Sequence, residues 1–233
     1  MLVFKYGQNT SQASEEAVIP GGSAQASDDE GAQTRPHVRA KSAAAPAHAL
    51  AQRLSKTIVL VGLMGAGKSC VGKRLAACLG LPFVDADREI EEAAGCSISD
   101  YFAAHGEKTF RDGERRVIQR LLGNPMHVLA TGGGAFMDPS TRALIKDKAI
   151  SIWLKAELDQ LLKRIGRRND RPLLQNVDPR AKLAELIDMR YPVYAQADLT
   201  VESADGPPDV TVQRVLRAIE VDLAGESSGT RQP

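Results

Sequence analysis

The strongest chemical signal in the chain is a glycine-rich stretch, residues 62–69, which reads Gly-Leu-Met-Gly-Ala-Gly-Lys-Ser and fits the phosphate-binding pattern G-x-x-x-x-G-K-[ST]. An apolar run precedes it and a helical pattern follows it, which is the strand–loop–helix context that this pattern needs. Lys68 can reach the β- and γ-phosphates of a nucleotide, and the Ser69 hydroxyl can bind Mg²⁺. The stretch predicts a nucleotide site with a magnesium ion.

A second signal is a pair of acidic residues, Asp85 and Asp87, at the end of a short predicted strand. Residues two apart in an extended chain point the same way, so both carboxylates can face a phosphate pocket. One can hold Mg²⁺, directly or through water, and the other can accept a proton from the hydroxyl that receives the phosphate. The alternative is that both residues only cap a helix expected from Arg88, because aspartate is a common N-cap.

A run of adjacent glycines, Gly132, Gly133 and Gly134, follows another predicted buried strand. Backbone without side chains can approach a ligand closely there, and its N–H groups can bind an anion or a hydroxyl. A plain flexible turn is the alternative interpretation, so the run is a weak signal by itself.

Arg111 and Arg190 are cations that can either bind a ligand or have only a structural role. Arg111 follows the core-facing Phe110 on a predicted helix, and Glu114 can hold it in place, although such a pair is more typical of a surface ion pair. Arg190 lies at a predicted helix end beside tyrosines, where a cation commonly just offsets the helix dipole. The residues alone leave both questions open.

A polar, basic loop over residues 166–178 interrupts the helical pattern. Arginines in and just before it can fold over a triphosphate as a mobile lid, where they would offset developing charge and exclude water. A solvated basic loop is an equally good interpretation from composition. The arginines concerned are Arg164, Arg167, Arg168 and Arg171.

The elements that must position these residues alternate along the chain. Apolar runs predict strands over residues 58–61, 81–84, 127–131, 149–154 and 199–201. Helical patterns lie between them, over residues 88–94, 106–122, from 139, 158–165, 179–194 and from 209 onward. This alternation predicts an α/β fold, a three-layer sandwich in which a central parallel sheet is flanked by helices.

Ligands of parallel sheets bind beyond the carboxyl ends of the strands. The phosphate-loop stretch, the acidic pair and the glycine run each follow a predicted strand directly. We therefore expect all of them to converge at one edge of the sheet.

The chain of 233 residues is long enough for one good-sized domain with extensions. Residues 1–52 are rich in Ala, Ser, Gly, Gln and charge, with only a weak period at their end, and we expect a disordered extension there. The folded domain is expected over residues 53–224, followed by a frayed tail over 225–233.

Composition argues against several classes of protein. The formal net charge of +1 disfavours a protein that coats nucleic acid or an anionic membrane. No apolar stretch approaches the roughly 20 residues that span a bilayer, and the N-terminus lacks a secretory signal. The sparse cysteines, Cys70, Cys78 and Cys96, have no metal spacing and indicate reduced thiols. We expect a cytoplasmic protein.

Taken in order, these motifs resemble those of the shikimate kinase family, small P-loop enzymes of aromatic amino acid synthesis. The resemblance covers about residues 56–223, nearly the whole predicted domain. A phosphate loop alone indicates only nucleotide binding, whereas the ordered set is far more specific. The set comprises that loop, Asp85-Ala86-Asp87, Gly106-Glu107 through Phe110-Arg111, Gly132-Gly133-Gly134, Arg171-Pro172-Leu173-Leu174 and Arg190-Tyr191-Pro192-Val193-Tyr194.

The resemblance implies phosphate transfer from ATP to the 3-hydroxyl of shikimate, giving shikimate 3-phosphate and ADP, with Mg²⁺ as cofactor. It implies that Lys68 contacts the transferred phosphate, that Ser69 binds the metal and that Asp85 supports it through water. Arg171 would reach the phosphates from the lid, and Arg164 would lie near adenine. The implied ATP-binding residues are Gly65, Ala66, Gly67, Lys68, Ser69, Cys70, Arg164 and Arg171; at Cys70 the family usually has threonine.

For the acceptor, the resemblance implies that Asp87 binds the hydroxyls and acts as the general base, while Arg111 and Arg190 hold the shikimate carboxylate. The glycine run would line the same pocket. These roles suit a small anion that carries hydroxyls, because such a ligand calls for paired cations, hydroxyl acceptors and close backbone. The implied catalytic residues are Lys68, Asp87 and Arg171.

Two other functions compete with this interpretation. A related small-molecule kinase, such as a gluconate kinase, would share the fold, but the arginines directed at a carboxylate and the glycine run argue against it. A nucleotide-binding regulator without phosphate transfer would show damage at Lys68, Ser69, Asp85 or Asp87, and all are intact. The resemblance and the lack of an apolar interface stripe favour a monomer.

Overall fold

The computed structural model describes residues 44–166 and 178–228. The strands are β1 (Thr57–Val61), β2 (Phe83–Asp85), β3 (Val128–Ala130), β4 (Ala149–Lys155) and β5 (Leu199–Glu202). The helices are α1 (Ala44–Arg53), α2 (Lys68–Leu79), α3 (Ala86–Ala94), α4 (Ile98–Leu121), the short 3₁₀ helix η1 (Ala135–Met137), α5 (Pro139–Lys148), α6 (Leu158–Ile165), α7 (Pro179–Tyr194) and α8 (Pro208–Ser228).

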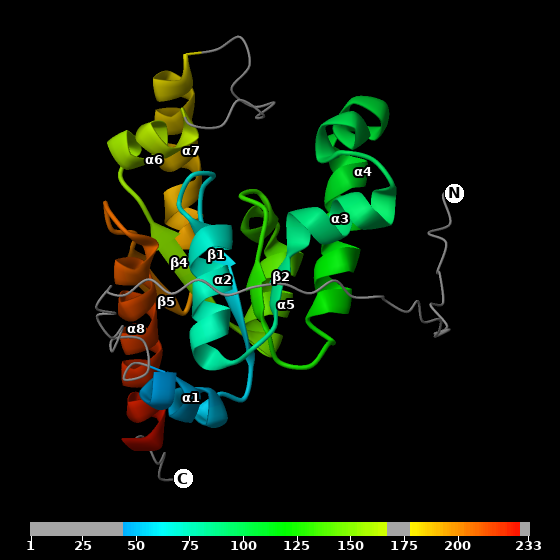
Figure 1. The fold of residues 1–233 in the computed structure, drawn as a ribbon. Helices are drawn as coiled ribbons and strands as arrows, with labels where there is room; N and C mark the ends of the chain where they lie inside the picture. The colour runs from blue at the N-terminus through cyan, green and yellow to red at the C-terminus, as the bar shows by residue number, and fades with distance from the viewer. Residues whose placement is uncertain (1–43, 167–177, 229–233) are drawn as a thin grey trace, which may run out of the picture.

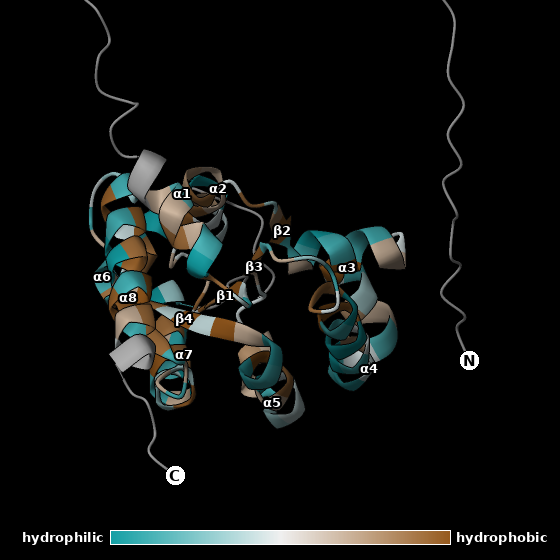
Figure 2. Ribbon diagram, turned by 90° about the horizontal axis from the view of Figure 1, so that it is seen from below, coloured by the Kyte–Doolittle hydropathy of each residue, from teal (hydrophilic) through white to brown (hydrophobic). Residues whose placement is uncertain are grey.

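The strands form one five-stranded sheet in the order β2-β3-β1-β4-β5, and every pair is parallel. β1 lies at the centre, where Val59 is opposite Leu129 of β3 and Ser151 of β4. Helices cover both faces, with α2 against α1 and α8 on one side and α5 on the other (Figures 1 and 2). The predicted parallel α/β sandwich is confirmed.

The strand order explains where a ligand can enter. The neighbours of β1 are β3 and β4, so the chain turns in opposite directions on the two sides of β1, and a ligand crevice is expected at its carboxyl end. In Figure 1 the α3–α4 unit and the α6–α7 unit rise on opposite sides of the loop that joins β1 to α2. The glycine-rich stretch is that loop.

The strand and helix ends follow local chemistry. Ser97 caps α4 by accepting a hydrogen bond from the Asp100 N–H, and Asp138 caps α5 by accepting one from the Thr141 N–H at 2.7 Å. The helix expected from residue 106 instead continues back to Ile98 through a kink at Gly106, where φ is 75° and ψ is 169°. Glycine tolerates this left-handed φ, so the two helical segments join without a break in the chain.

The fold begins earlier than the predicted domain start at residue 53. α1 packs against α2 and α8, and it buries Leu50 and Ala51 together with Leu54 just beyond its end. The weak period at the end of the predicted extension was therefore a real but narrow apolar face, too rich in alanine to stand out. Residues 1–43, the rest of that extension, lie outside the described residues.

Two further properties bear on function. None of the helices in the described ranges is long and apolar enough to cross a membrane. Cys70, Cys78 and Cys96 are free cysteines, and Cys78 is partly buried against the core.

Candidate active site

The loop between β1 and α2 has the backbone shape that its glycines predicted. Gly62, Gly65 and Gly67 have φ angles of 137°, 82° and 98°, in the region that favours glycine. A Cβ at Gly62 would also meet the Leu154 carbonyl at 2.8 Å. Since Gly67 is the N-cap of α2, the loop delivers the positive end of that helix to the crevice.

Lys68 lies over the loop that precedes it. Its Nζ donates to the carbonyl oxygens of Gly62 at 2.8 Å and Leu63 at 3.0 Å. These contacts hold the ammonium against the start of the loop. A triphosphate in the loop would lie within the reach of this side chain.

Ser69 and Asp85 bring their oxygens together across the sheet edge. Ser69 Oγ donates to Asp85 Oδ2 at 2.7 Å, although Ser69 itself is exposed. A hydroxyl and a carboxylate side by side suit Mg²⁺, which prefers oxygen ligands and takes its remaining ligands from phosphates and water. No group of three or more His, Cys, Asp or Glu side chains that could hold a metal ion occurs in the described part of the chain.

The acidic pair is arranged differently from the extended stretch that we expected. Asp85 is the N-cap of α3, and its Oδ1 accepts a hydrogen bond from the Asp87 N–H at 3.2 Å. α3 begins at Ala86, so Asp87 belongs to its first turn. The extended geometry was wrong because the cap forms earlier than Arg88. Asp85 thus caps the helix and also contacts Ser69.

Asp87 is a half-buried carboxylate that faces Lys68 and the glycine run. Burial raises the pKa of Asp87 above its usual value; Lys68 opposes this rise, while Asp85 and Glu91 add to it. A carboxylate with a raised pKa holds a proton more readily. The environment therefore improves Asp87 as a proton acceptor.

The glycine run is the point where the polar side chains meet. A Cβ at Gly132 would lie 2.6 Å from Asp87 Oδ1, and a Cβ at Gly134 would overlap Arg111 Nη2. At Gly133 the nearest atom would be Arg190 NH1, at 3.5 Å. Each glycine thus lies against a different predicted site residue.

Arg111 is held by an acidic pair on its own helix. Its NH1 donates to Glu114 Oε2 at 2.6 Å and its NH2 donates to Glu107 Oε1 at 3.3 Å. The Arg111 side chain is 27% exposed and that of Glu114 only 4%. Burial raises the pKa of the Glu114 carboxyl, which Arg111 opposes. This pair is therefore no ordinary surface ion pair.

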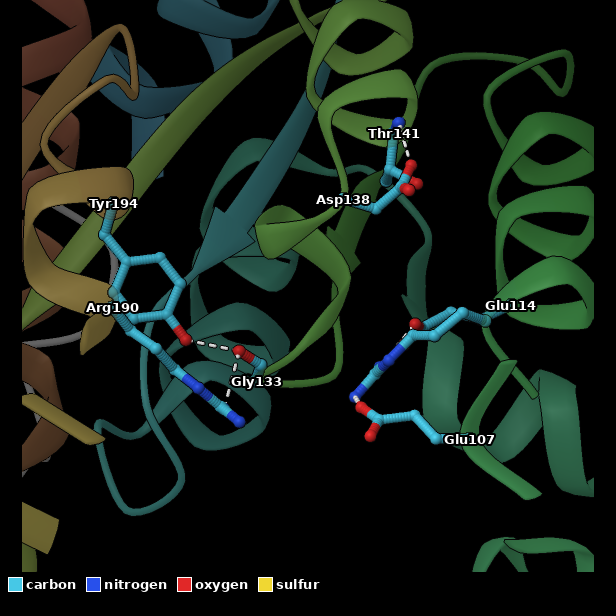
Figure 3. Close-up of polar contacts among 8 residues, drawn as sticks. Glu107, Glu114, Gly133, Asp138, Thr141, Arg190 and Tyr194 are labelled. Carbon is cyan, nitrogen blue, oxygen red and sulfur yellow. Dashed lines mark hydrogen bonds and ion pairs between the residues drawn. The ribbon is translucent and has the colours of Figure 1, made fainter. Parts of the chain in front are cut away.

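Arg190 comes from the opposite side, on α7. Its NH1 donates to the Gly133 carbonyl oxygen at 3.1 Å, and the Tyr194 hydroxyl donates to the same oxygen. Figure 3 shows Arg190 and Tyr194 reaching Gly133 from one side, with Glu107 and Glu114 on the other. The Nε of Arg190 is buried and has no hydrogen-bond partner among the described residues.

Arg164 links α6 to the loop of β1. Its NH1 donates to Ser203 Oγ at 2.8 Å and lies 3.4 Å from the Gly65 carbonyl oxygen. Ser203 is buried, and its hydroxyl donates in turn to the Ala66 carbonyl oxygen at 3.0 Å. The predicted nucleotide-site arginine thus adjoins the phosphate loop.

The remaining predicted residues are those of the basic loop and Cys70. Arg171 lies outside the described residues, as do Arg167, Arg168 and all other residues of the predicted lid between Gly166 and Asp178. Cys70 is exposed on α2, where its Sγ accepts a hydrogen bond from Arg74 NH1 at 2.9 Å.

Sequence reasoning missed the part played by two hydroxyls. Tyr194 and Ser203 each bond a backbone carbonyl of the site, at Gly133 and Ala66. Tyr194 stood within a quoted motif, but only its neighbour Arg190 received a role. Ser203 had no signal in the sequence, because a serine after a strand is common in loops.

Comparisons with known proteins agree with this geometry. The family model for shikimate kinase matches residues 64–220. The shikimate kinase of Paramagnetospirillum magneticum is 60% identical over 170 residues, which cover 73% of this chain and 87% of that protein. The shikimate kinase of Caulobacter vibrioides is 59% identical over 170 residues, covering 73% of this chain and 85% of that protein.

Solved structures show the same likeness. The shikimate kinase of Acinetobacter baumannii, in complex with shikimate, is 38% identical with a TM-score of 0.71, and the match covers 76% of this chain and 98% of that one. A gluconokinase from Sinorhizobium meliloti has a TM-score of 0.54 at 18% identity over 76% of this chain and 98% of that one, a likeness that shows the fold alone. With a phosphate loop, an acidic pair and a glycine run meeting at one edge of a parallel sheet, and with these relatives, the chain belongs to the shikimate kinase family.

Proposed function

We propose a division of roles among the residues of this site for the shikimate kinase activity that the family membership gives the chain. The activity is the transfer of phosphate from ATP to the 3-hydroxyl of shikimate, with shikimate 3-phosphate and ADP as products. One observation carries the assignment: Gly132, Gly133 and Gly134 lie against Asp87, Arg190 and Arg111. An acceptor placed on this backbone is within reach of a base and of cations together.

On the nucleotide side, the N–H groups of residues 62–69 and the start of α2 bind the phosphates. Lys68 exchanges its contacts with the loop carbonyls for phosphate oxygens, because a dianionic phosphate is a stronger partner than a neutral carbonyl. Ser69 and Asp85 would hold Mg²⁺, which offsets phosphate charge when it is bound. Arg164 would lie beside adenine, and Arg171 would reach the phosphates.

On the acceptor side, Asp87 takes the proton of the attacking hydroxyl. Its raised pKa suits this step, because a carboxylate with a higher pKa takes up a proton more readily, although the Lys68 ammonium opposes the rise. Arg111 and Arg190 bind the carboxylate of shikimate. The phosphate is transferred between these two sides, mainly through positioning and charge compensation.

A cytoplasmic location and a monomeric state belong to the same proposal. The free cysteines are consistent with a reducing compartment, and ATP is the phosphate donor. A sedimentation measurement of the purified chain tests the oligomeric state.

The deciding experiment measures ADP release by the purified chain with Mg-ATP, with shikimate or gluconate as the acceptor. We expect release that depends on shikimate and stays at the background rate with gluconate. Release with gluconate instead would contradict the acceptor assignment. The same assay with Arg190→Ala and Arg111→Ala tests the residue roles, because an unchanged shikimate KM in both variants would remove them from the carboxylate site.

A further inference from the structure

Tyr194 is the largest side chain in the described structure that is fully buried beside the candidate site. It lies on α7 four residues after Arg190, so both side chains lie on one face of the helix, a turn apart. Both donate hydrogen bonds to one atom, the carbonyl oxygen of Gly133. The glycine run is thus tied to α7 at a single peptide group.

The tie also sets the direction of the next N–H group. A trans peptide is planar, so its C=O and N–H point in opposite directions, and the described chain has no cis peptide bond. When the Gly133 carbonyl is drawn toward α7, the Gly134 N–H must therefore point away from α7. Within the described residues, neither the Gly133 nor the Gly134 N–H donates a backbone hydrogen bond, which leaves both groups for a ligand.

The tyrosine ring is held so that its hydroxyl cannot turn away. The ring centroid lies 6.0 Å from that of Trp153, 6.3 Å from Tyr191 and 6.4 Å from Phe136. Burial raises the pKa of Tyr194 to about 12, against the opposing Arg190 guanidinium, so the hydroxyl stays a proton donor at physiological pH. A rigid donor fixes the carbonyl better than a mobile one.

We propose that Tyr194 is a positioning residue for the acceptor: its hydroxyl holds the Gly133–Gly134 peptide and the adjacent Arg190 guanidinium in the orientation that receives shikimate. The inference rests on the proposed function, in which the glycine run and Arg190 bind shikimate. It adds a residue that touches neither substrate and acts only through these groups.

The test compares Tyr194→Phe with a matched control, Tyr191→Phe. The Tyr191 hydroxyl also donates to a backbone carbonyl, that of Ala156, which is outside the acceptor site. Both substitutions keep the ring and remove one hydrogen bond, so both are expected to lower the melting temperature to a similar extent. The kinetic constants for shikimate and ATP and the calorimetric affinity for shikimate are measured for each variant below its melting temperature.

We expect Tyr194→Phe to raise the shikimate KM and Kd roughly fivefold, the usual effect of one hydrogen bond, while the ATP KM stays within about twofold. Tyr191→Phe should leave the shikimate constants unchanged. An unchanged shikimate KM in Tyr194→Phe, an equal rise for both substrates, or the same rise in Tyr191→Phe would each overturn the inference.

Arg190→Ala separates this inference from the proposed function. If Arg190→Ala leaves the shikimate Kd unchanged, the proposed acceptor site itself is wrong. If Arg190→Ala weakens shikimate binding and Tyr194→Phe does not, the acceptor site stands and only the positioning role of Tyr194 fails.

Discussion

The proposed nucleotide side and the proposed acceptor side of the site are built in contrasting ways. The nucleotide side is one continuous stretch, residues 62–69, whose shape follows from its own glycines and the helix that it starts. The acceptor side joins Asp87, Arg111, the glycine run and Arg190, which come from four separate segments and meet only in the folded chain. A local motif can therefore be identified from sequence, whereas an assembled site depends on the packing of α3, α4 and α7.

The two sides also differ in how far their polar side chains are buried. Ser69 on the nucleotide side is exposed. On the acceptor side burial raises the pKa of both Asp87 and Glu114, and the charge of Asp87 adds to the rise for Glu114. Burial disfavours the charged form of both carboxyl groups, and perturbed carboxylates of this kind are common at functional sites.

Asp87→Asn gives the largest expected effect. Without its proton acceptor, kcat should fall by about 10²–10⁴-fold, while ATP binding by calorimetry stays near that of the wild type. A control variant, Glu89→Gln on the same helix, loses only a surface ion pair with Arg120 and should keep its turnover. Wild-type turnover in Asp87→Asn would remove Asp87 as the base.

The same substitution should stabilise the protein. The pKa of Asp87 is raised in the folded state above its ordinary value of 3.8, so the folded chain binds this proton more tightly than the unfolded chain does. The stability that this gives is present in acid and is lost as the pH rises from about that ordinary value through the folded-state pKa. We therefore expect Asp87→Asn to raise the melting temperature at pH 7; a fall would contradict the cost of burying this charge.

Arg111→Ala should have the next largest effect, confined to the acceptor side. In the proposed complex Arg111 pairs with the shikimate carboxylate. Removing one partner of a buried, hydrogen-bonded charge pair costs about 2–5 kcal/mol of binding free energy, so the shikimate KM should rise at least about thirtyfold. The ATP KM should change far less. Arg115→Ala is the matched control, because its ion pair with Asp112 on the same helix is more exposed. An equal rise in the KM for shikimate and the KM for ATP would contradict the assignment of Arg111 to the acceptor side.

Gly134→Ala sharpens the comparison without removing a functional group. The φ of Gly134 is −95°, so alanine fits the backbone, but its Cβ would overlap the Arg111 guanidinium and displace it. We expect roughly a tenfold rise in the shikimate KM from this displacement. Gly113→Ala, where a Cβ meets nothing within 4 Å, is the control and should leave kinetics unchanged. Wild-type kinetics for Gly134→Ala would mean that Arg111 adapts freely.

Ser203→Ala gives the smallest expected effect, and on the nucleotide side alone. It removes hydrogen bonds to Ala66 and Arg164, each worth about 1 kcal/mol, so the ATP KM should rise roughly fivefold with little change for shikimate. Ser151→Ala also removes a buried hydroxyl, one bonded to Asp198 away from the loop, and serves as the control. A larger change for shikimate than for ATP would contradict the division between the sides.

The sequence by itself determined the parallel α/β sandwich, the phosphate loop and the start of α5 at residue 139. Each depends on residues that are neighbours in the chain. The strands follow from runs of apolar residues, and the loop follows from glycines that permit a positive φ. The helix starts where Asp138 accepts a hydrogen bond from the N–H of Thr141, three residues later. The resemblance to the family also implied that Arg111, Arg190 and the glycine run line one acceptor pocket, before any contact between them was known.

Only the tertiary structure decided how those residues meet. It showed Asp87 in a helical turn rather than an extended stretch, and Glu114 buried beneath Arg111. It also showed the Tyr194 hydroxyl on the Gly133 carbonyl, 61 residues away along the chain. Contacts across such separations depend on how whole helices pack against the sheet edge, and no local pattern of residues encodes that packing.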